Sequence, residues 1–239
     1  YLGSLGALGV IVSANFKVLP RPRAEATVVA GCAAPEEAFA RAARLRQSLD
    51  PVAALEVARQ NGRWLMAARI EGREATVEAV ASRIAKAVAN DDVTSLDKEA
   101  SADWWHSYVA QQSPFPGDDA VLIRCGVRPK ETPVLAAGVA AALSDLGVAV
   151  PHLSASPGLG SVVVRLDAGA VGSAERLAEV QDIFLGLAET VTILAAPAAW
   201  KRGIDVWGRR PEGFAVMRSL REQFDPQRTI NPGRFAGFL

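Results

Sequence analysis

The sequence is poor in the side chains that bind metals and carry redox chemistry. Its 239 residues include two cysteines and two histidines, and aromatic residues make up 6%. Cys32 and Cys125 are far apart, and neither has the CxxC or Cys/His spacing of a zinc site. We therefore expect free, reduced thiols, no disulfide framework and no metal site, as is usual for a cytoplasmic protein.

Charge of one sign and long hydrophobic runs are also missing. Lysine and arginine together number 26, as do aspartate and glutamate, so the formal net charge is zero. A neutral chain has no long-range field to attract nucleic acid. No apolar run approaches the roughly 20 residues that a membrane helix requires. Half of the residues are hydrophobic, which predicts a globular protein with one large domain or two small ones.

Hydrophobic patterning in the first half predicts a strand, a boundary and then six elements. Residues 10–18 alternate in a way that favours a strand, and the prolines in 20–23 end it. The Asn61-Gly62 pair favours a tight hairpin turn because it readily adopts positive φ. The elements expected after the boundary are a strand at 27–30, a helix at 35–49, strands at 52–58 and 63–70, a helix at 77–88 and a strand at 93–96.

The same order of elements recurs about a hundred residues later. After a linking helix at 102–111 we expect a strand at 120–127, a helix from Thr132, strands at 149–155 and 161–167, a helix capped by Ser173 and a strand at 191–195. The order β-α-β-β-α-β is that of a ferredoxin-like unit. We predict an α+β fold with two such units, 24–97 and 118–196, whose antiparallel sheets join with helices on one face. Because this order is common, a chance similarity of the two halves is the alternative.

The first residues form a glycine-rich motif, GSLGALGVI. Small side chains let backbone N–H groups come close to a bound molecule. Tight turns use the same residues, so a purely structural role is the alternative. The residues that we expect to contact a ligand are Gly3, Ser4, Gly6, Gly9, Val10 and Ile11.

The tail at 224–235 reads FDPQRTINPGRF and follows a predicted amphipathic helix. Two prolines fix φ and a glycine permits close backbone approach, so the Asn231 amide and the Arg234 guanidinium are expected to be held in place. The alternative is a tail that packs on its own helix.

Histidine and tryptophan provide two weaker signals. His152 precedes a glycine-containing turn, where an imidazole is able to act as a general base on a hydroxy acid, although a lone histidine on a strand is usually structural. Residues 200–211 are basic and hold two tryptophans. They either line a pocket for an anionic substrate or form a loop that the tryptophans anchor.

Four segments together resemble FAD-linked oxidases of the vanillyl-alcohol oxidase (VAO) or PCMH type, and within that family the FAD-binding chain of bacterial glycolate oxidase. They are GSLGALGVI at 3–11, KVLPRPRAE at 17–25, AWKRGIDVWG at 199–208 and FDPQRTINPGRF at 224–235. The resemblance implies that the glycine-rich motif and Asn231 contact FAD. It also implies that Arg234 holds a substrate carboxylate or offsets charge on the reduced flavin, and it leaves His152 as the candidate base.

The resemblance further implies how the chain is divided and what it does. Residues 1–23 would end an FAD-binding domain, 24–199 would form the cap or substrate domain, and 200–239 would return to the FAD domain. The implied activity is oxidation of glycolate or a similar 2-hydroxy acid. The implied partners are a second flavin subunit and an iron–sulfur subunit, through which the protein would be peripheral to the inner membrane.

The family's main pyrophosphate-binding loops have no counterpart in this sequence. The chain begins at Tyr1 without a signal segment, and we expect it to start within a domain. We therefore expect the isolated chain to bind FAD weakly or not at all and to be inactive. The alternatives are a non-catalytic cap or scaffold protein and a tandem ferredoxin-like module for a small metabolite. In the flavoprotein reading, both ends of the chain meet beside one cofactor.

Overall fold

The computed structural model describes residues 3–48, 50–88, 92–113 and 119–239. The first half builds four strands and two helices before a third helix crosses the sheet. Its elements are β1 (Ala24–Cys32), α1 (Pro35–Gln47), β2 (Ala54–Gln60), β3 (Arg63–Gly72), α2 (Glu74–Ala87), β4 (Val93–Leu96) and α3 (Lys98–Gln111).

The second half repeats that order and then adds a C-terminal segment. Its strands and longer helices are β5 (Ala120–Gly126), α4 (Thr132–Asp145), β6 (His152–Ser156), β7 (Ser161–Asp167), α6 (Ala174–Leu187) and β8 (Thr190–Ala195). Short helices lie at η1 (Pro129–Glu131) and α5 (Ala168–Val171). The C-terminal segment holds η2 (Trp200–Arg202), α7 (Phe214–Phe224) and η3 (Ala236–Phe238).

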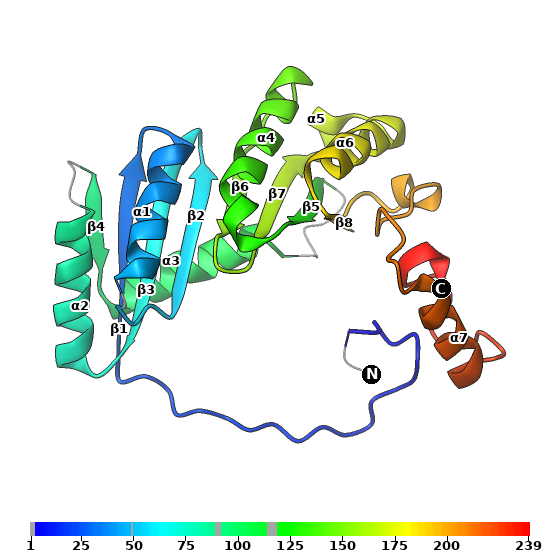
Figure 1. Cartoon of the computed structure of the whole chain (residues 1–239), viewed down its shortest axis with the longest axis horizontal. Coiled ribbons are helices and arrows are strands. Elements are labelled where there is room, and N and C mark those ends of the chain that lie inside the picture. The colour runs from blue at the N-terminus through cyan, green and yellow to red at the C-terminus, as the bar shows by residue number, and fades with distance from the viewer. Residues whose placement is uncertain (1–2, 49, 89–91, 114–118) are drawn as a thin grey trace.

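The eight strands form one sheet in the order β4-β1-β3-β2-β6-β7-β5-β8. All neighbours are antiparallel, and the two halves join where β2 pairs with β6, with Val57 opposite Ala155. From one outer edge inward the strands are β4, β1, β3 and β2, and from the other they are β8, β5, β7 and β6 (Figure 1). Within each half, the fourth strand of that half is therefore at the edge, followed by the first, third and second. The predicted antiparallel α+β architecture is therefore present.

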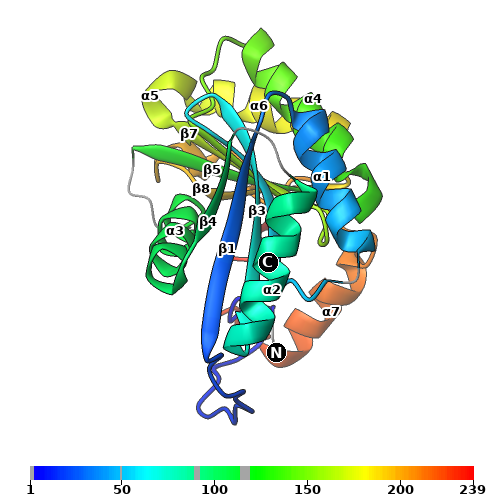
Figure 2. The same ribbon diagram turned by 90° about the vertical axis from the view of Figure 1, so that its left-hand side faces the viewer.

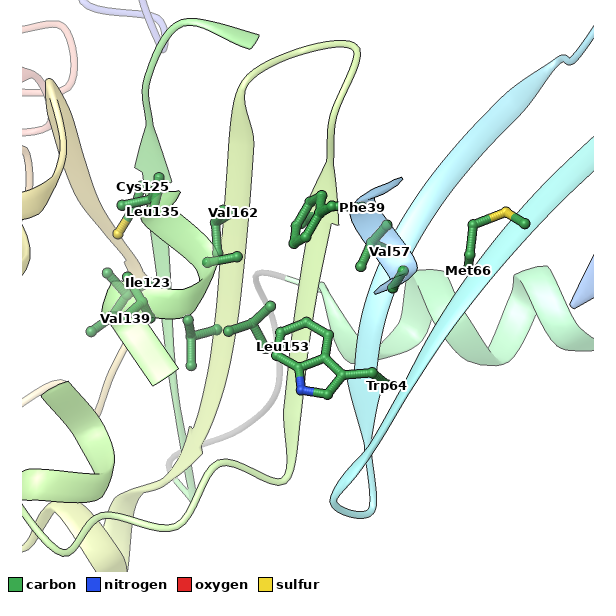
Figure 3. Packing of buried hydrophobic residues seen from close by; sticks show 14 of the residues in the cluster. Phe39, Val57, Trp64, Met66, Ile123, Cys125, Leu135, Val139, Leu153 and Val162 are labelled. Carbon is green, nitrogen blue, oxygen red and sulfur yellow. The ribbon is translucent and has the colours of Figure 1, made fainter. Parts of the chain in front are cut away.

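One face of the sheet holds the main core, under α1, α2, α4 and α6. The core continues across the seam between the halves, where Phe39 and Trp64 have ring centroids 6.5 Å apart and Leu153 is fully buried (Figure 3). Each large apolar side chain buried in this way contributes about 1.5–3 kcal/mol. The seam is therefore a packed continuation of the core.

The expectation that the helices lie on one face is wrong for α3. This helix lies on the opposite side of the sheet from α1 and α2 (Figure 2). Trp105 and Tyr108 are buried there against the small side chains of Ala58 and Ala67, which leave room for an indole. The Trp105 Nε1 donates to Thr27 Oγ1 at 2.8 Å, which satisfies its only polar atom.

The predicted strand at 10–18 is also wrong. Residues 9–22 have no regular structure, and Val12 is 92% and Phe16 84% exposed. Alternating apolar residues fit a strand, but a strand also needs a neighbour for its backbone hydrogen bonds, and none pairs with this segment in the part of the chain described. The segment runs outside the sheet between the N-terminal motif and β1 (Figure 1).

Local turn chemistry behaves as predicted. Asn61 and Gly62 have φ of 50° and 81° and close the hairpin of β2 and β3, as a turn with two positive φ values requires. The Ser173 side chain accepts from the Arg176 backbone N–H and caps α6. The Asn61-Gly62 turn thus sets the start of β3, and the Ser173 cap sets the start of α6.

Candidate functional site

The two ends of the chain meet in the structure. The Asn231 side-chain amide donates to the Leu5 carbonyl at 3.0 Å, across 226 residues of sequence. A Cβ on Gly6, which has φ of +75°, would lie 2.6 Å from Asn231 Nδ2. Glycine is favoured at that position, because a Cβ would displace the Asn231 amide and a side chain would strain the left-handed backbone.

An open pocket of about 510 Å³ lies at this junction. Five of the six predicted motif residues line it, together with Asn231, so the structure brings these residues together. The backbone N–H groups of Gly9, Val10 and Ile11 make no hydrogen bond to any residue that the structure describes. Free amides beside a pocket are suited to a polar cofactor. The lining residues are Ser4, Gly6, Gly9, Val10, Ile11, Thr229, Ile230 and Asn231.

Gly3 lies outside that pocket. It borders a neighbouring cavity of about 240 Å³ between the N-terminal motif and α7. The cavity is largely apolar, and Ala7, which is 3% exposed, packs on this side. This contact attaches the N-terminal motif to the C-terminal helix. The cavity is lined by Gly3, Ser4, Ala7, Leu8, Met217, Leu220, Arg221, Phe235 and Leu239.

Buried polar groups hold the tail in shape. Asp225 accepts from the backbone N–H groups of Thr229 and Ile230 at 2.9 and 2.8 Å, and these bonds lower the pKa of its carboxyl. Arg221, 4% exposed, donates to the Ile230 carbonyl at 2.9 Å. The backbone that leads to Asn231 is therefore fixed before any ligand binds.

The segment at 200–211 anchors the tail. Trp207 Nε1 donates to the Arg234 carbonyl at 3.3 Å, and its ring lies 5.4 Å from that of Phe235. The Arg234 side chain is exposed and lines neither pocket. The structure thus fixes the backbone of Arg234 without bringing its guanidinium to the junction.

His152 lies away from the chain ends, at the start of β6 in the middle of the sheet (Figure 1). It is 3% exposed, faces the Tyr108 ring edge-on at 5.8 Å, and its Nε2 has no hydrogen-bond partner among the described residues. Burial, with the nearby positive Arg165, lowers its pKa to about 4. The imidazole is therefore neutral at pH 7.

Sequence reasoning missed a polar cluster beside His152. Glu56 accepts from Tyr108 Oη and from Ser156 Oγ, both at 2.8 Å, and this joins β2, α3 and β6 across the seam. Burial raises the Glu56 pKa to about 7, although the two hydrogen bonds oppose the shift. In the sequence, Glu56 alternates with apolar neighbours like an ordinary solvent-facing strand residue. Only the position of α3 reveals that its carboxylate is half-buried and bonded to Tyr108.

The two cysteine side chains are removed from solvent to different extents, Cys32 partly and Cys125 fully. Cys32 and Cys125 are free, and burial raises the pKa of Cys125 to about 12 and also raises that of Cys32. Neither thiol is ionised at neutral pH. Within the described ranges, no cluster of three or more metal-ligand side chains occurs, and no helix has the length and apolarity to cross a membrane.

The fold is similar to parts of longer solved structures. The structure of alkyldihydroxyacetonephosphate synthase superimposes on this chain with a TM-score of 0.52 and 15% sequence identity. The match covers 97% of this chain and 48% of the synthase chain. A VAO-type flavoprotein from Myceliophthora thermophila matches 87% with 46% of its own, at 12% identity and a TM-score of 0.48. Glucooligosaccharide oxidase from Acremonium strictum, which carries a cysteinyl- and histidyl-linked FAD, matches 88% with 55% of its own, at 8% identity and 0.48.

The TM-score of 0.52 shows that the chain shares its fold with part of alkyldihydroxyacetonephosphate synthase. The chain spans about half the length of the structures that it resembles. No protein-family model and no curated protein matches the sequence.

Proposed function

We propose that this chain is the substrate-covering part of an FAD-dependent oxidoreductase that oxidises a 2-hydroxy acid such as glycolate. The observation that carries the proposal is the contact between Asn231 and Leu5, which gathers the motif residues of both ends around one pocket. The fold shared with alkyldihydroxyacetonephosphate synthase supports it. FAD would supply the hydride acceptor, and this chain would supply contacts to FAD and the surface over the substrate.

The division of the chain follows from that assignment. Residues 1–23 and 200–239 belong with an FAD-binding domain, and 24–199 form the cap. We also propose that the cap is a duplicated ferredoxin-like unit, 24–97 and 118–196. Matching registers support this. In the first unit, Arg69 of β3 lies opposite Thr27 of β1 and Ala54 of β2. In the second unit, Arg165 of β7 lies opposite Leu122 of β5 and His152 of β6.

Exposed apolar side chains support docking onto an FAD-binding part. Val10, Val12, Phe16, Val18 and Leu19 are all at least 78% exposed and lie on one continuous segment. A run of large apolar side chains in water usually marks a surface that another part covers. The similar structures are about twice the length of this chain, which leaves room for such a part.

Residues of this chain would perform two tasks in the reaction. The amides of 9–11 and the Asn231 side chain would hold FAD. Arg234 is the proposed partner of negative charge near FAD, a role that requires its exposed guanidinium to turn toward the junction. His152 is the proposed acceptor of the substrate hydroxyl proton because its imidazole is neutral at pH 7. This role requires the substrate to reach the middle of the sheet, where the His152 Nε2 is buried. A second flavin subunit and an iron–sulfur subunit are the proposed partners, with peripheral attachment to the inner membrane through them.

Backbone amide NMR during an FAD titration tests the FAD assignment, because it detects weak binding. We expect shift changes that concentrate at residues 4–11 and 229–231, and that disappear in Gly6→Ala. Gly158→Ala is the matched control, since a Cβ there meets nothing within 4 Å. If FAD shifts other regions instead, or leaves residues 4–11 unaffected, the proposed cofactor site is wrong.

A further inference from the structure

One face of the sheet carries α3. In the first half of the sheet α3 packs on this face, whereas in the second half no helix of the described residues does. The apolar cluster in the first half includes Trp105 and Tyr108 of α3. The corresponding cluster in the second half contains only strand residues, Leu122, Val163, Ala195 and Leu194. No helix of the described residues contributes to it.

A pocket of about 490 Å³ opens on this second half, beside the C-terminal end of α3. Residues of the four strands β5, β6, β7 and β8 and of the β6–β7 turn form it, and Gln112 borders it. This volume lies within the range of sites for small organic molecules. Its polar lining residues are Gln112, Arg124, Ser156, Ser161, Glu189 and Thr190.

Arg124 is the cation of this pocket that lacks a protein counter-ion. Its side chain is exposed on β5, and it makes no ion pair with any residue in the described part of the chain. The pocket lining also holds one acidic residue, Glu189, but its Oε1 pairs with Arg128 Nε at 3.5 Å and not with Arg124. In the first half, Val29 occupies the register position of Arg124, opposite Ala67 as Arg124 is opposite Val163. A guanidinium thus replaces an apolar side chain on the half of this face that no helix of the described residues covers.

Hydroxyl groups lie around the same pocket. Ser161 and Thr190 lie at the two strand positions that pair with Gly126, and a Cβ on Gly126 would come within 2.5 Å of Thr190 Oγ1. A guanidinium beside several hydroxyl groups suits a ligand that has both a carboxylate and a hydroxyl.

We propose that this pocket binds a small organic carboxylate, with Arg124 holding the carboxylate and with Ser161 and Thr190, which flank Gly126, contacting its hydroxyl. The choice of a 2-hydroxy acid as that ligand rests on the function proposed above. The binding site itself does not, because no flavin contact enters the argument.

A titration of the purified chain with glycolate tests this directly. Backbone amide NMR at pH 7 follows the residues around the pocket, and ethylene glycol serves as the uncharged ligand of similar size. We expect saturable shifts at Gly126, Ser156, Ser161 and Thr190 with glycolate, and none with ethylene glycol. Inorganic phosphate is the third ligand, and we expect it to bind more weakly than glycolate.

Three arginine variants make the test specific. Arg124→Gln is expected to raise the glycolate Kd about tenfold or more, because a charge-assisted hydrogen bond is lost. Arg124→Lys keeps the charge but not the fork of donors, so we expect an intermediate loss. Arg44→Gln, on the exposed side of α1, should leave the Kd unchanged.

The inference is overturned if glycolate produces no shifts at the pocket, if Arg124→Gln binds as tightly as the unmodified chain, or if phosphate binds more tightly than glycolate. Failure of the FAD titration with intact glycolate binding would reject the proposed oxidoreductase and leave this site standing. If FAD binds as expected but glycolate does not, the carboxylate site is rejected and the proposed oxidoreductase stands.

Discussion

The two halves of the sheet share their strand order but differ in how they use the face that carries α3. In the first half, Arg69 contacts Glu25 and Glu71 at 2.6 and 3.1 Å and lies 5.9 Å above the Trp105 ring. Its register equivalent Arg165 has no ion pair among the described residues. The comparison teaches that one half is closed for stability while the other keeps its cations available.

Removing the indole that closes the first half should have the largest effect. Trp105→Ala takes away a side chain that is 8% exposed, together with its hydrogen bond to Thr27. We expect a loss of about 3–5 kcal/mol in the free energy of unfolding, measured by urea denaturation. Leu159→Ala, at an exposed turn of the second half, is the control and should change stability very little. Similar losses in both variants would break the contrast between the halves.

Glu56 gives the seam a pH dependence of known sign. In the unfolded chain this carboxyl loses its proton near pH 4.5, whereas the folded protein retains it to about pH 7. Its contribution to stability is therefore complete below pH 4.5 and falls as pH rises through 7. Between pH 5 and 8 we expect the wild type to lose on the order of 3 kcal/mol relative to Glu56→Gln. Urea titrations at each pH measure this, with the exposed Glu78→Gln as control; parallel pH profiles would contradict it.

His152 has the opposite slope, of similar size. Its pKa falls from 6.5 in the unfolded chain to about 4 in the folded protein, so its contribution is complete above pH 6.5 and is lost as pH falls through 4. In the wild type, the pH-dependent contributions of Glu56 and His152 to the free energy of unfolding therefore partly cancel. In His152→Gln the loss of stability on acidification should shrink by on the order of 3 kcal/mol, whereas His106→Gln on the exposed side of α3 should not change it. An unchanged profile in His152→Gln would show that the histidine is accessible to protons.

The smallest change is expected at the junction of the chain ends. Asn231→Ala removes one hydrogen bond to Leu5, which is worth about 0.5–1.5 kcal/mol. Global unfolding should hardly change, because the junction lies outside the sheet. Limited proteolysis should instead cleave residues 3–9 faster in this variant than in the wild type. Equal cleavage would mean that the hydrogen bond does not hold the N-terminal motif.

The sequence predicts the parts of this fold that local chemistry decides. The strands at 93–96 and 161–167 have the predicted bounds, and Asn61-Gly62 forms the predicted turn, because these signals lie within a few residues. The side of the sheet that α3 covers depends on the sizes of Ala58 and Ala67, which are distant in sequence. Local patterning also favours a strand at 10–18, but no sequence signal shows that it lacks a pairing partner.

The candidate site divides in the same way. The approach of Gly6 to Asn231 was predictable because both belong to recognisable motifs. The half-buried carboxylate of Glu56 and the lack of an ion pair for Arg124 among the described residues were not, since both follow from where α3 ends its coverage of the sheet. Residues whose role depends on tertiary packing look like ordinary strand residues in the sequence.

The most direct test of the account is a nuclear Overhauser measurement between the Asn231 side-chain amide protons and the Gly6 α protons. The structure requires these groups to touch, since a Cβ on Gly6 would lie 2.6 Å from Asn231 Nδ2. We predict a strong cross-peak in the wild type. Its absence, with the cross-peaks inside the tail between Asp225 and Ile230 intact, would show that the two ends do not form a shared site.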